Sequence, residues 1–313
     1  MDHTTGATGG SGARGQTAAA EQRLSGVFVP VVTPFERGEL RLDALRENLR
    51  KLSATEVKGY LALGSNGEAR SLDDEEERRV LEVFAEEMRE KVVMVGTGSE
   101  SLRNTLRKTL RAAEMGFPFA SVLTPGYFAK MMKDETLVAY FNEVADRSPI
   151  PILIYNAPGF AAGVSLSAAA VSRLADHRNI VGIKDSAPTG PGAFLTALSP
   201  EQRFSVLAGS TNFFYPSMVL GAVGGVLSSA NYLPEACCRL RRLAVEGNHA
   251  AALQLHHRLV RINRAVSSRF GVAGVKAAMD CRGFRGGEPR SPLRPLDADQ
   301  RASLCALLEA AGL

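Results

Sequence analysis

The 313-residue chain lacks the sequence signatures of several large classes of protein. No apolar run approaches the roughly 18 residues that a membrane-spanning helix needs, and no signal-peptide core stands near the N-terminus. The 37 basic and 33 acidic residues are interspersed, without the Lys/Arg run that grips nucleic acid. We therefore expect a cytoplasmic protein that binds neither a membrane nor a nucleic acid.

Cysteine and histidine are also scarce, which argues against several kinds of site. The four cysteines lack the Cys-x-x-Cys spacing of a zinc or redox centre, and adjacent Cys237 and Cys238 are typical of helix packing. None of the five histidines ends a predicted strand, so neither a histidine metal site nor a Ser-His nucleophile is indicated. The spacing of Gly96 and Gly98 does not match a dinucleotide-binding loop. We expect a function that uses no metal and no cofactor.

The first 23 residues consist largely of Gly, Thr, Ala and Ser, with almost no apolar bulk. Such a segment cannot offset the entropy lost on ordering, so we predict a disordered tail over residues 1–23. An organelle transit peptide is the alternative, but the stretch has only two arginines, an early Asp2 and no amphipathic period.

From residue 26 onward, short apolar runs alternate with longer segments of helical periodicity. The runs are nearly continuous in apolar character, which is typical of strands covered on both faces. They occupy residues 26–33, 59–63, 91–97, 119–124, 151–155, 179–184, 204–209 and 223–229. Eight strand–helix units predict an α/β fold, a (β/α)8 TIM barrel over residues 24–246, with an open doubly wound sheet as the alternative. The helical patterns of residues 247–313, interrupted at 289–296, predict a C-terminal helical domain.

The reactive groups of such a barrel lie where its strands end, on the C-terminal face. Lys184 ends the apolar run 179–184, a place where burial disfavours the charged form of the side chain. A neutral amine there can attack a carbonyl carbon; the alternative is a surface lysine whose stem passes the sheet edge. Tyr155 ends the preceding run and could move protons beside the amine, or it could be a core tyrosine bonded to a backbone carbonyl.

A turn of small and polar residues, GSNGE (64–68), follows the second predicted strand. Its backbone N–H groups can hold a carboxylate, as turns and helix N-termini do, although any Gly-rich turn after a strand looks similar. Ser65 and Asn66 are therefore candidate substrate-binding residues.

Several segments in the same order resemble the dihydrodipicolinate synthase / N-acetylneuraminate lyase family over residues 25–313. They are PVVTPF (30–35), GSNGE (64–68), TPGYF (124–128), YNAPG (155–159), GIKDS (182–186), LAGS (207–210) and GAVGGVLSSAN (221–231). The set is specific, where any single motif is not. The resemblance implies a metal-free aldol or retro-aldol reaction on pyruvate or a pyruvate-derived 2-keto acid with an aldehyde partner. It also implies a homo-oligomer, a dimer or a tetramer.

The resemblance further implies a role for each matching residue. Lys184 would form the Schiff base, Tyr155 would act as acid and base beside it, and Ser65 would be a relay hydroxyl. Tyr127 resembles a tyrosine that enters a neighbouring subunit's site across an interface. The Ser65–Asn66 backbone would hold the substrate carboxylate. The other expected substrate-binding residues are Ser186, Gly209 and Ser210.

One departure from the family pattern bears on the substrate. Phe160 stands where the synthases have the arginine that anchors their second substrate's carboxylate, so a bidentate anion clamp is lost. Together with GSNGE and the segment 269–287, this favours the 4-hydroxy-2-oxoglutarate aldolase branch, with pyruvate and glyoxylate as products.

Other substrates and activities remain open. The alternatives are 2-keto-3-deoxy sugar-acid aldolases or dehydratases, hydratase-aldolases and condensing synthases. Dihydrodipicolinate synthase itself and a non-catalytic metabolite sensor are disfavoured. Arg70 and Lys130 lie near the candidate residues and could bind a second carboxylate, although solvated surface charge is the favoured interpretation of both.

Overall fold

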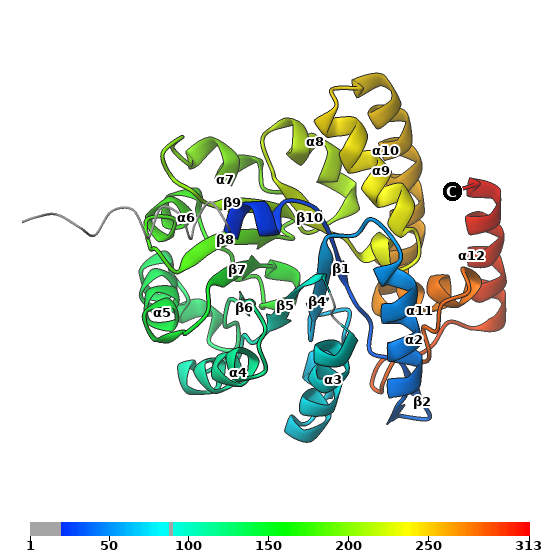
Figure 1. The fold of residues 1–313 in the computed structure, drawn as a ribbon, viewed down its shortest axis with the longest axis horizontal. Coiled ribbons are helices and arrows are strands. Elements are labelled where there is room, and N and C mark those ends of the chain that lie inside the picture. Colours follow the sequence, from blue (N-terminus) through cyan, green and yellow to red (C-terminus); the bar gives the residue numbers. More distant parts are fainter. Residues whose placement is uncertain (1–19, 88–89) are drawn as a thin grey trace, which may run out of the picture.

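The computed structural model describes residues 20–87 and 90–313. Within these ranges eight parallel strands form a closed barrel in the order β1-β10-β9-β8-β7-β6-β5-β4 (Figure 1). Because β1 pairs with both β10 and β4, the sheet has no edge, and the open-sheet alternative is wrong. The strands are β1 (Val27–Pro30), β4 (Gly59–Ala62), β5 (Val92–Gly96), β6 (Phe119–Leu123), β7 (Ile152–Asn156), β8 (Ile180–Asp185), β9 (Ser205–Ala208) and β10 (Gly224–Val226). The predicted TIM barrel is confirmed, since every predicted run overlaps one of these strands.

A helix follows each barrel strand and packs outside it (Figure 1). These helices are α2 (Leu42–Ser53), α3 (Asp74–Glu87), α4 (Leu102–Glu114), α5 (Asp134–Arg147), α6 (Ala168–Leu174), α7 (Gly192–Ala197), α8 (Phe214–Val219) and α9 (Pro234–Val245). The C-terminal extension holds α10 (His249–Asn263), a π-helical turn (Arg264–Ser268), α11 (Arg269–Cys281) and α12 (Ala298–Ala311). A small hairpin, β2 (Phe35–Glu36) and β3 (Glu39–Leu40), was not predicted. Within the described ranges, no helix is long and apolar enough to cross a membrane.

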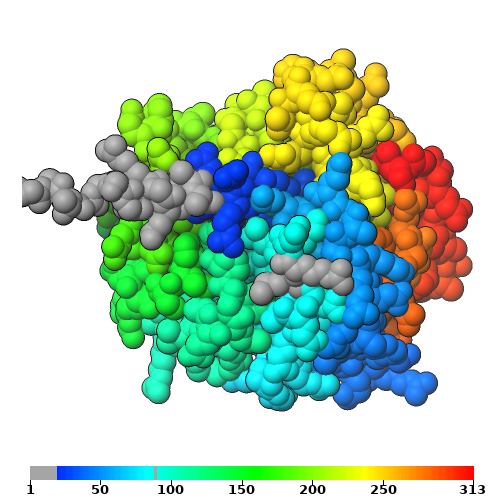
Figure 2. Space-filling model, viewed as in Figure 1, coloured from blue at the N-terminus to red at the C-terminus, as the bar shows by residue number. Residues whose placement is uncertain are grey.

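Apolar side chains from every strand fill the barrel interior, among them Phe28, Leu61 and Phe119. Ala20 and Leu24, from a short helix at residues 20–24, join this cluster. That helix, dark blue in Figures 1 and 2, covers the barrel end that faces the viewer. Residues 1–19 of the predicted tail lie outside the described residues. Residues 20–23 are helical rather than disordered, because Ala20 and Leu24 find apolar partners.

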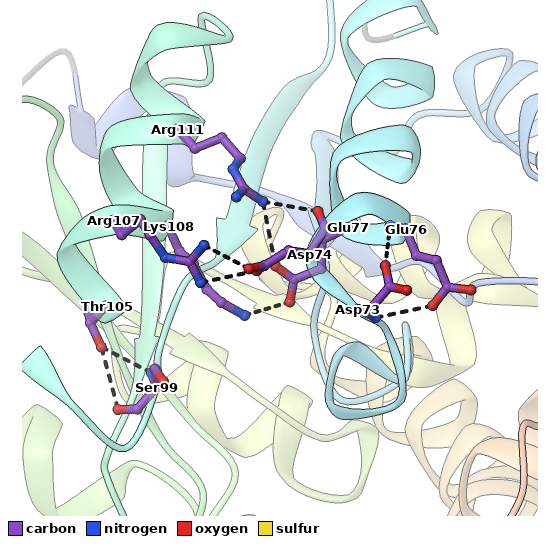
Figure 3. A network of polar contacts seen from close by, with 9 residues as sticks. All are labelled: Asp73, Asp74, Glu76, Glu77, Ser99, Thr105, Arg107, Lys108 and Arg111. Atoms are coloured by element: carbon purple, nitrogen blue, oxygen red, sulfur yellow. Dashed lines mark hydrogen bonds and ion pairs between the residues drawn. The ribbon is translucent and has the colours of Figure 1, made fainter. Parts of the chain in front are cut away.

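Ion pairs tie α3 to α4, the helices that follow β4 and β5 (Figure 3). Arg107 of α4 donates two hydrogen bonds, of 2.7 and 3.0 Å, to the Asp74 carboxylate. Lys108 pairs with Glu77, whose carboxylate is almost fully buried. Glu77 and Lys108 also line a small cavity to which Ser65 contributes. The contacts between these two helices therefore lie close to the candidate substrate-binding turn.

The C-terminal helices share the core of the barrel. Leu259 of α10, Met279 of α11 and Leu308 of α12 belong to the same buried cluster as residues of β1, β4 and α2. The segment between α11 and α12 runs beside the β2–β3 hairpin (Figure 1), where Phe35 and Glu288 form a β-bridge. Packing is thus continuous across the domain boundary that we predict at residue 247.

The cysteines fall into two groups. Cys237 and Cys238 are free and buried in α9, as predicted for packing residues. Cys281 and Cys305 form a disulfide between α11 and α12 that the sequence analysis did not predict. Because disulfides are uncommon in a reducing compartment, this pair is at odds with the expected cytoplasmic location.

Candidate active site

Lys184 and Tyr155 lie side by side where two neighbouring strands end. The parallel register of β7 and β8 pairs Tyr155 with Lys184. Both side chains are buried, and Lys184 Nζ lies 3.8 Å from the centre of the Tyr155 ring. Side chains alternate along a strand, so the next residue, Asp185, points to the opposite face. The amine is therefore held against the phenol and away from the adjacent carboxylate.

Asp185 and Asn156, which follow Lys184 and Tyr155 on the same strands, are held by hydrogen bonds. Asn156 Nδ2 donates to Asp185 Oδ1 at 2.7 Å, and Asn156 Oδ1 accepts from the Leu166 backbone N–H at 3.1 Å. Burial raises the pKa of Asp185, while the bond from Asn156 acts in the opposite direction. These contacts join the ends of β7 and β8 to the loop that carries Phe160.

The Ser65 hydroxyl approaches the tyrosine from the turn after β4. Ser65 Oγ and the Tyr155 hydroxyl are 3.4 Å apart, at the long end of hydrogen-bonding distance. Proton transfer between the two hydroxyls needs only a small approach of one toward the other. The three side chains thus form a row from the turn after β4 through the phenol to the amine.

The turn that carries Ser65 is held by side chains on several sides. Thr33 Oγ1 donates to the Gly67 carbonyl at 2.7 Å, and Asn66 Nδ2 donates to Ser228 Oγ at 2.9 Å. Leu63 and Glu68, at the two ends of the turn, both have positive φ angles, of 53° and 51°. Non-glycine residues adopt this region only where their surroundings enforce it, which is common in functional loops.

Glu68 is anchored by the C-terminal extension. Its carboxylate forms an ion pair with the ammonium of Lys276 in α11, and both side chains are buried. The Arg290 backbone N–H donates to Glu68 Oε2 at 2.8 Å, and Lys276 Nζ donates to the Glu288 carbonyl at 2.8 Å. Burial lowers the pKa of Lys276 to about 8, although Glu68 acts in the opposite direction. No sequence pattern marks this link, because its two members are more than 200 residues apart and neither ends a strand.

A cavity of about 550 Å³ opens above Lys184. It brings together Lys184, Tyr155, Ser65, Asn66, Ser186, Gly209 and Ser210, all of them expected site residues. Gly209 is required by close approach, since a Cβ at this position would lie 2.0 Å from Ser186 Oγ and 2.5 Å from the Asp185 carbonyl oxygen. Any larger residue there would displace the end of β8.

Tyr127 is not brought to this cavity within a single chain. Its side chain is 78% exposed and contacts Phe128, with the ring centres 5.0 Å apart. Its backbone N–H donates to Glu100 Oε2 at 2.8 Å, which holds the loop after β6. Arg70 forms an ion pair with Glu100 and lines the smaller cavity beside α3, while Lys130 lies on another part of the surface. Neither cation lines the cavity above Lys184.

The C-terminal extension forms the roof of the cavity, with residues that were not predicted as part of the site. Asn263, Ser268 and Phe270 line it from the junction of α10 and α11, and Arg294 from the segment before α12. Gly271 interrupts the helical geometry of α11 with a φ of 58°, a value that glycine adopts without strain. A search confined to strand ends cannot find these residues, because they belong to helices and loops distant in sequence.

This arrangement suits the chemistry of an amine with a carbonyl compound. The amine can add to a carbonyl carbon, the phenol can move a proton at the carbonyl oxygen, and the hydroxyl can pass that proton on. Among the described residues, no group of three or more His, Cys, Asp or Glu side chains is placed to hold a metal ion.

Comparison with known proteins agrees with this geometry. The chain is 34% identical over 281 residues to the 4-hydroxy-tetrahydrodipicolinate synthase of Methanothrix thermoacetophila, covering 89% of this chain and 94% of that protein. It is 35% identical over 286 residues to the enzyme of the same name from Thermomicrobium roseum, covering 91% and 94%.

The chain is also similar to solved structures. YagE, a prophage protein of E. coli K12 in complex with pyruvate, superposes with a TM-score of 0.85 at 28% identity, covering 92% of this chain and 99% of that one. KD(P)GA from T. tenax superposes with a TM-score of 0.82 at 25% identity, again covering 92% and 99%. Residues 23–311 match the Dihydrodipicolinate synthetase family. The chain therefore belongs to this family, whose members are aldolase-type lyases that act through a lysine Schiff base.

Proposed function

We propose that the chain cleaves 4-hydroxy-2-oxoglutarate to pyruvate and glyoxylate as a class I aldolase. The observation that carries the proposal is the buried Lys184 amine, 3.8 Å from the centre of the Tyr155 ring and open to the cavity. The Ser65 hydroxyl lies 3.4 Å from that phenol. An amine, a phenol and a hydroxyl in this order supply the groups that imine formation needs.

The first half of the reaction forms the iminium ion. The Lys184 amine adds to the C2 ketone, and Tyr155 donates its proton to the carbinolamine oxygen, which leaves as water. Ser65 passes protons to and from the phenol. The backbone N–H groups of Ser65 and Asn66 hold the C1 carboxylate. The iminium then withdraws electrons from C3.

The second half breaks the carbon–carbon bond. Tyr155, now a phenolate, takes the proton of the C4 hydroxyl, and the C3–C4 electron pair moves to the iminium as glyoxylate departs. Tyr155 gives that proton to C3 of the enamine that remains, and water then releases pyruvate from Lys184. One hydroxy-keto acid thus yields one pyruvate and one aldehyde.

The identity of residue 160 favours this reaction over that of the synthases. Phe160 lines the cavity and is 64% exposed, so it offers an apolar surface where the resemblance would place an arginine. Cleavage of a 2-keto-3-deoxy sugar acid is the second candidate, because the fold also matches that of KD(P)GA from T. tenax. Dehydratase, hydratase-aldolase and condensing reactions share the same iminium and remain alternatives.

Trapping with borohydride tests the covalent step. Reduction in the presence of pyruvate should add one reduced pyruvyl group to the peptide that contains Lys184, and Lys184→Arg should prevent it. A folded protein without this adduct would overturn the mechanism. A panel of glyoxylate, sugar aldehydes and aromatic aldehydes, each condensed with pyruvate, then separates the candidate substrates by rate.

We further propose a homo-oligomer in which Tyr127 contributes to a partner's site. Tyr127, Phe128 and Met131 are large, exposed and close in sequence, and exposed apolar clusters of this kind mark interfaces. Light scattering after size-exclusion chromatography measures the number of subunits directly. Tyr127→Ala should lower the number of subunits or lower the rate of turnover. A monomer with unchanged turnover in Tyr127→Ala would contradict the proposal. A cytoplasmic location stays part of the proposal, with the Cys281–Cys305 disulfide as the observation against it.

A further inference from the structure

We infer that Arg294 binds the second carboxylate of a dicarboxylic 2-keto acid and thereby selects this substrate class. The inference rests on the proposed function, because it concerns the far end of the molecule that Lys184 holds. Arg294 lies in the segment between α11 and α12 and lines the same cavity as Lys184.

The charged side chains that line the cavity are all basic. Of the described residues that line it, only Lys184 and Arg294 carry a basic group, and none is a carboxylate. In the proposed reaction the Lys184 nitrogen bonds to C2 of the substrate and is not available to bind a second carboxylate. Arg294 is therefore the cation left to bind an anion elsewhere in the cavity.

The Arg294 guanidinium is free to take a ligand. Among the described residues it has no hydrogen bond or ion pair, in contrast with Arg290 in the same segment. Arg290 binds the Glu76 carboxylate through both its terminal nitrogens, at 2.7 and 2.6 Å, and also binds the carbonyls of Gly38 and Ser71. One arginine of the segment is thus committed to the fold, and the other faces the cavity.

The backbone that carries Arg294 is held in place. The Arg290 N–H donates to Glu68 Oε2 at 2.8 Å, and the Leu293 N–H donates to the Arg290 carbonyl at 3.1 Å. Arg294 therefore follows a turn that is tied to the substrate-binding loop itself. Its position relative to Lys184 depends on the same buried Glu68 that fixes the turn with Ser65.

The chemistry of a guanidinium fits a carboxylate better than a neutral aldehyde end. Arginine offers a planar fork of N–H donors that matches a carboxylate with two parallel hydrogen bonds. Arg294 and Phe160 line the same cavity, so the anion clamp missing at residue 160 has a replacement in the roof. The C5 carboxylate of 4-hydroxy-2-oxoglutarate is the group that such a clamp would hold.

The test compares two substrates that differ at one group. 4-Hydroxy-2-oxoglutarate carries the second carboxylate, and 4-hydroxy-2-oxopentanoate has a methyl in its place. In Arg294→Gln, kcat/KM for the dicarboxylate should fall roughly 10- to 100-fold, the loss expected for a charge-assisted hydrogen bond. The value for the monocarboxylate should change less than about threefold, and Arg294→Lys should restore part of the lost activity because it keeps the charge.

Two further measurements test whether Arg294 acts by direct binding. One controls for the loss of a positive charge anywhere near the cavity, and the other measures binding without bond cleavage. Arg264→Gln removes an equal charge from the π-helical turn between α10 and α11, at an exposed residue outside the cavity lining, and should leave the rates with both substrates unaffected. 2-Oxoglutarate has the second carboxylate but no bond to cleave. Borohydride trapping with it should need a higher 2-oxoglutarate concentration in Arg294→Gln than in the wild type. Trapping with pyruvate should need the same pyruvate concentration in both proteins.

Equal losses on both substrates, or an equal loss in Arg264→Gln, would overturn the role of Arg294 while leaving the proposed function intact. A wild-type enzyme that traps pyruvate on Lys184 but prefers the monocarboxylate would overturn the inference and the proposed substrate together. A wild type that traps no keto acid would overturn the mechanism itself.

Discussion

Replacing Lys276 with methionine is expected to destabilise the protein by about 3–5 kcal/mol. Lys276 and Glu68 form an ion pair in which the exposed fractions of the two side chains are only 1% and 2%. Methionine keeps most of the volume of the lysine stem but leaves the Glu68 carboxylate buried without its counter-charge. An uncompensated buried charge costs several times more than the loss of a surface pair.

The same substitution should also reduce catalysis. Glu68 has a φ of 51° at the end of the turn that carries Ser65 and Asn66, and Lys276 holds its carboxylate. Without this anchor the carboxylate is expected to turn toward water and the turn to relax. We therefore expect kcat/KM to fall even at temperatures where the variant remains folded.

Denaturant unfolding followed by circular dichroism measures the change in the free energy of unfolding. Lys51→Met is the matched control, because Lys51 pairs with Glu47 at 2.8 Å but both side chains are more than 40% exposed. The control should lose less than about 1 kcal/mol. The double variant Glu68→Gln/Lys276→Met should regain most of the stability, since no buried charge remains, but not the lost activity. A single variant as stable as the wild type, or a double variant no better than the single, would refute the reasoning.

Three other outcomes follow from the structure. Tyr155→Phe should lower kcat by about 10²- to 10⁴-fold, because it removes the proton donor but keeps the ring beside Lys184, and an unchanged kcat would exclude the assigned role. Burial, followed by the charge of His257, lowers the pKa of His256 to about 4, below its ordinary value of 6.5. The unfolded chain therefore binds the additional proton, and stability should fall by up to about 3 kcal/mol as the pH drops from 6.5 to 4. His256→Phe should flatten that part of the profile relative to the wild type, and identical profiles would contradict it. Cys305→Ser should reduce the stability of the α11–α12 unit by about 3 kcal/mol, because the disulfide closes a loop with a sequence separation of 24; a peptide map without the cross-link would remove this effect.

The positions of the candidate site residues at the strand ends were predictable from residues close together in sequence. Lys184 and Tyr155 each end an apolar run, and the parallel arrangement of such runs brings their carboxyl ends to one face. Ser65, Asn66, Ser186, Gly209 and Ser210 follow the same rule and line the same cavity. The Cys281–Cys305 disulfide and the Lys276–Glu68 pair were not predictable, because no local pattern marks two side chains that meet only after folding.

The sequence by itself determined the barrel and the place of Lys184 at the end of a strand, because period, apolar character and strand ends are properties of short segments. Only the tertiary structure decided which residues line the cavity across from Lys184. The end of α10, α11 and the segment after it fold back over the barrel mouth. Asn263, Phe270 and Arg294 therefore become the roof of a cavity whose floor, at Lys184, lies 79 or more residues earlier in the sequence. Which distant side chains meet there depends on how α10 and α11 pack on the barrel, and packing is a property of the whole chain.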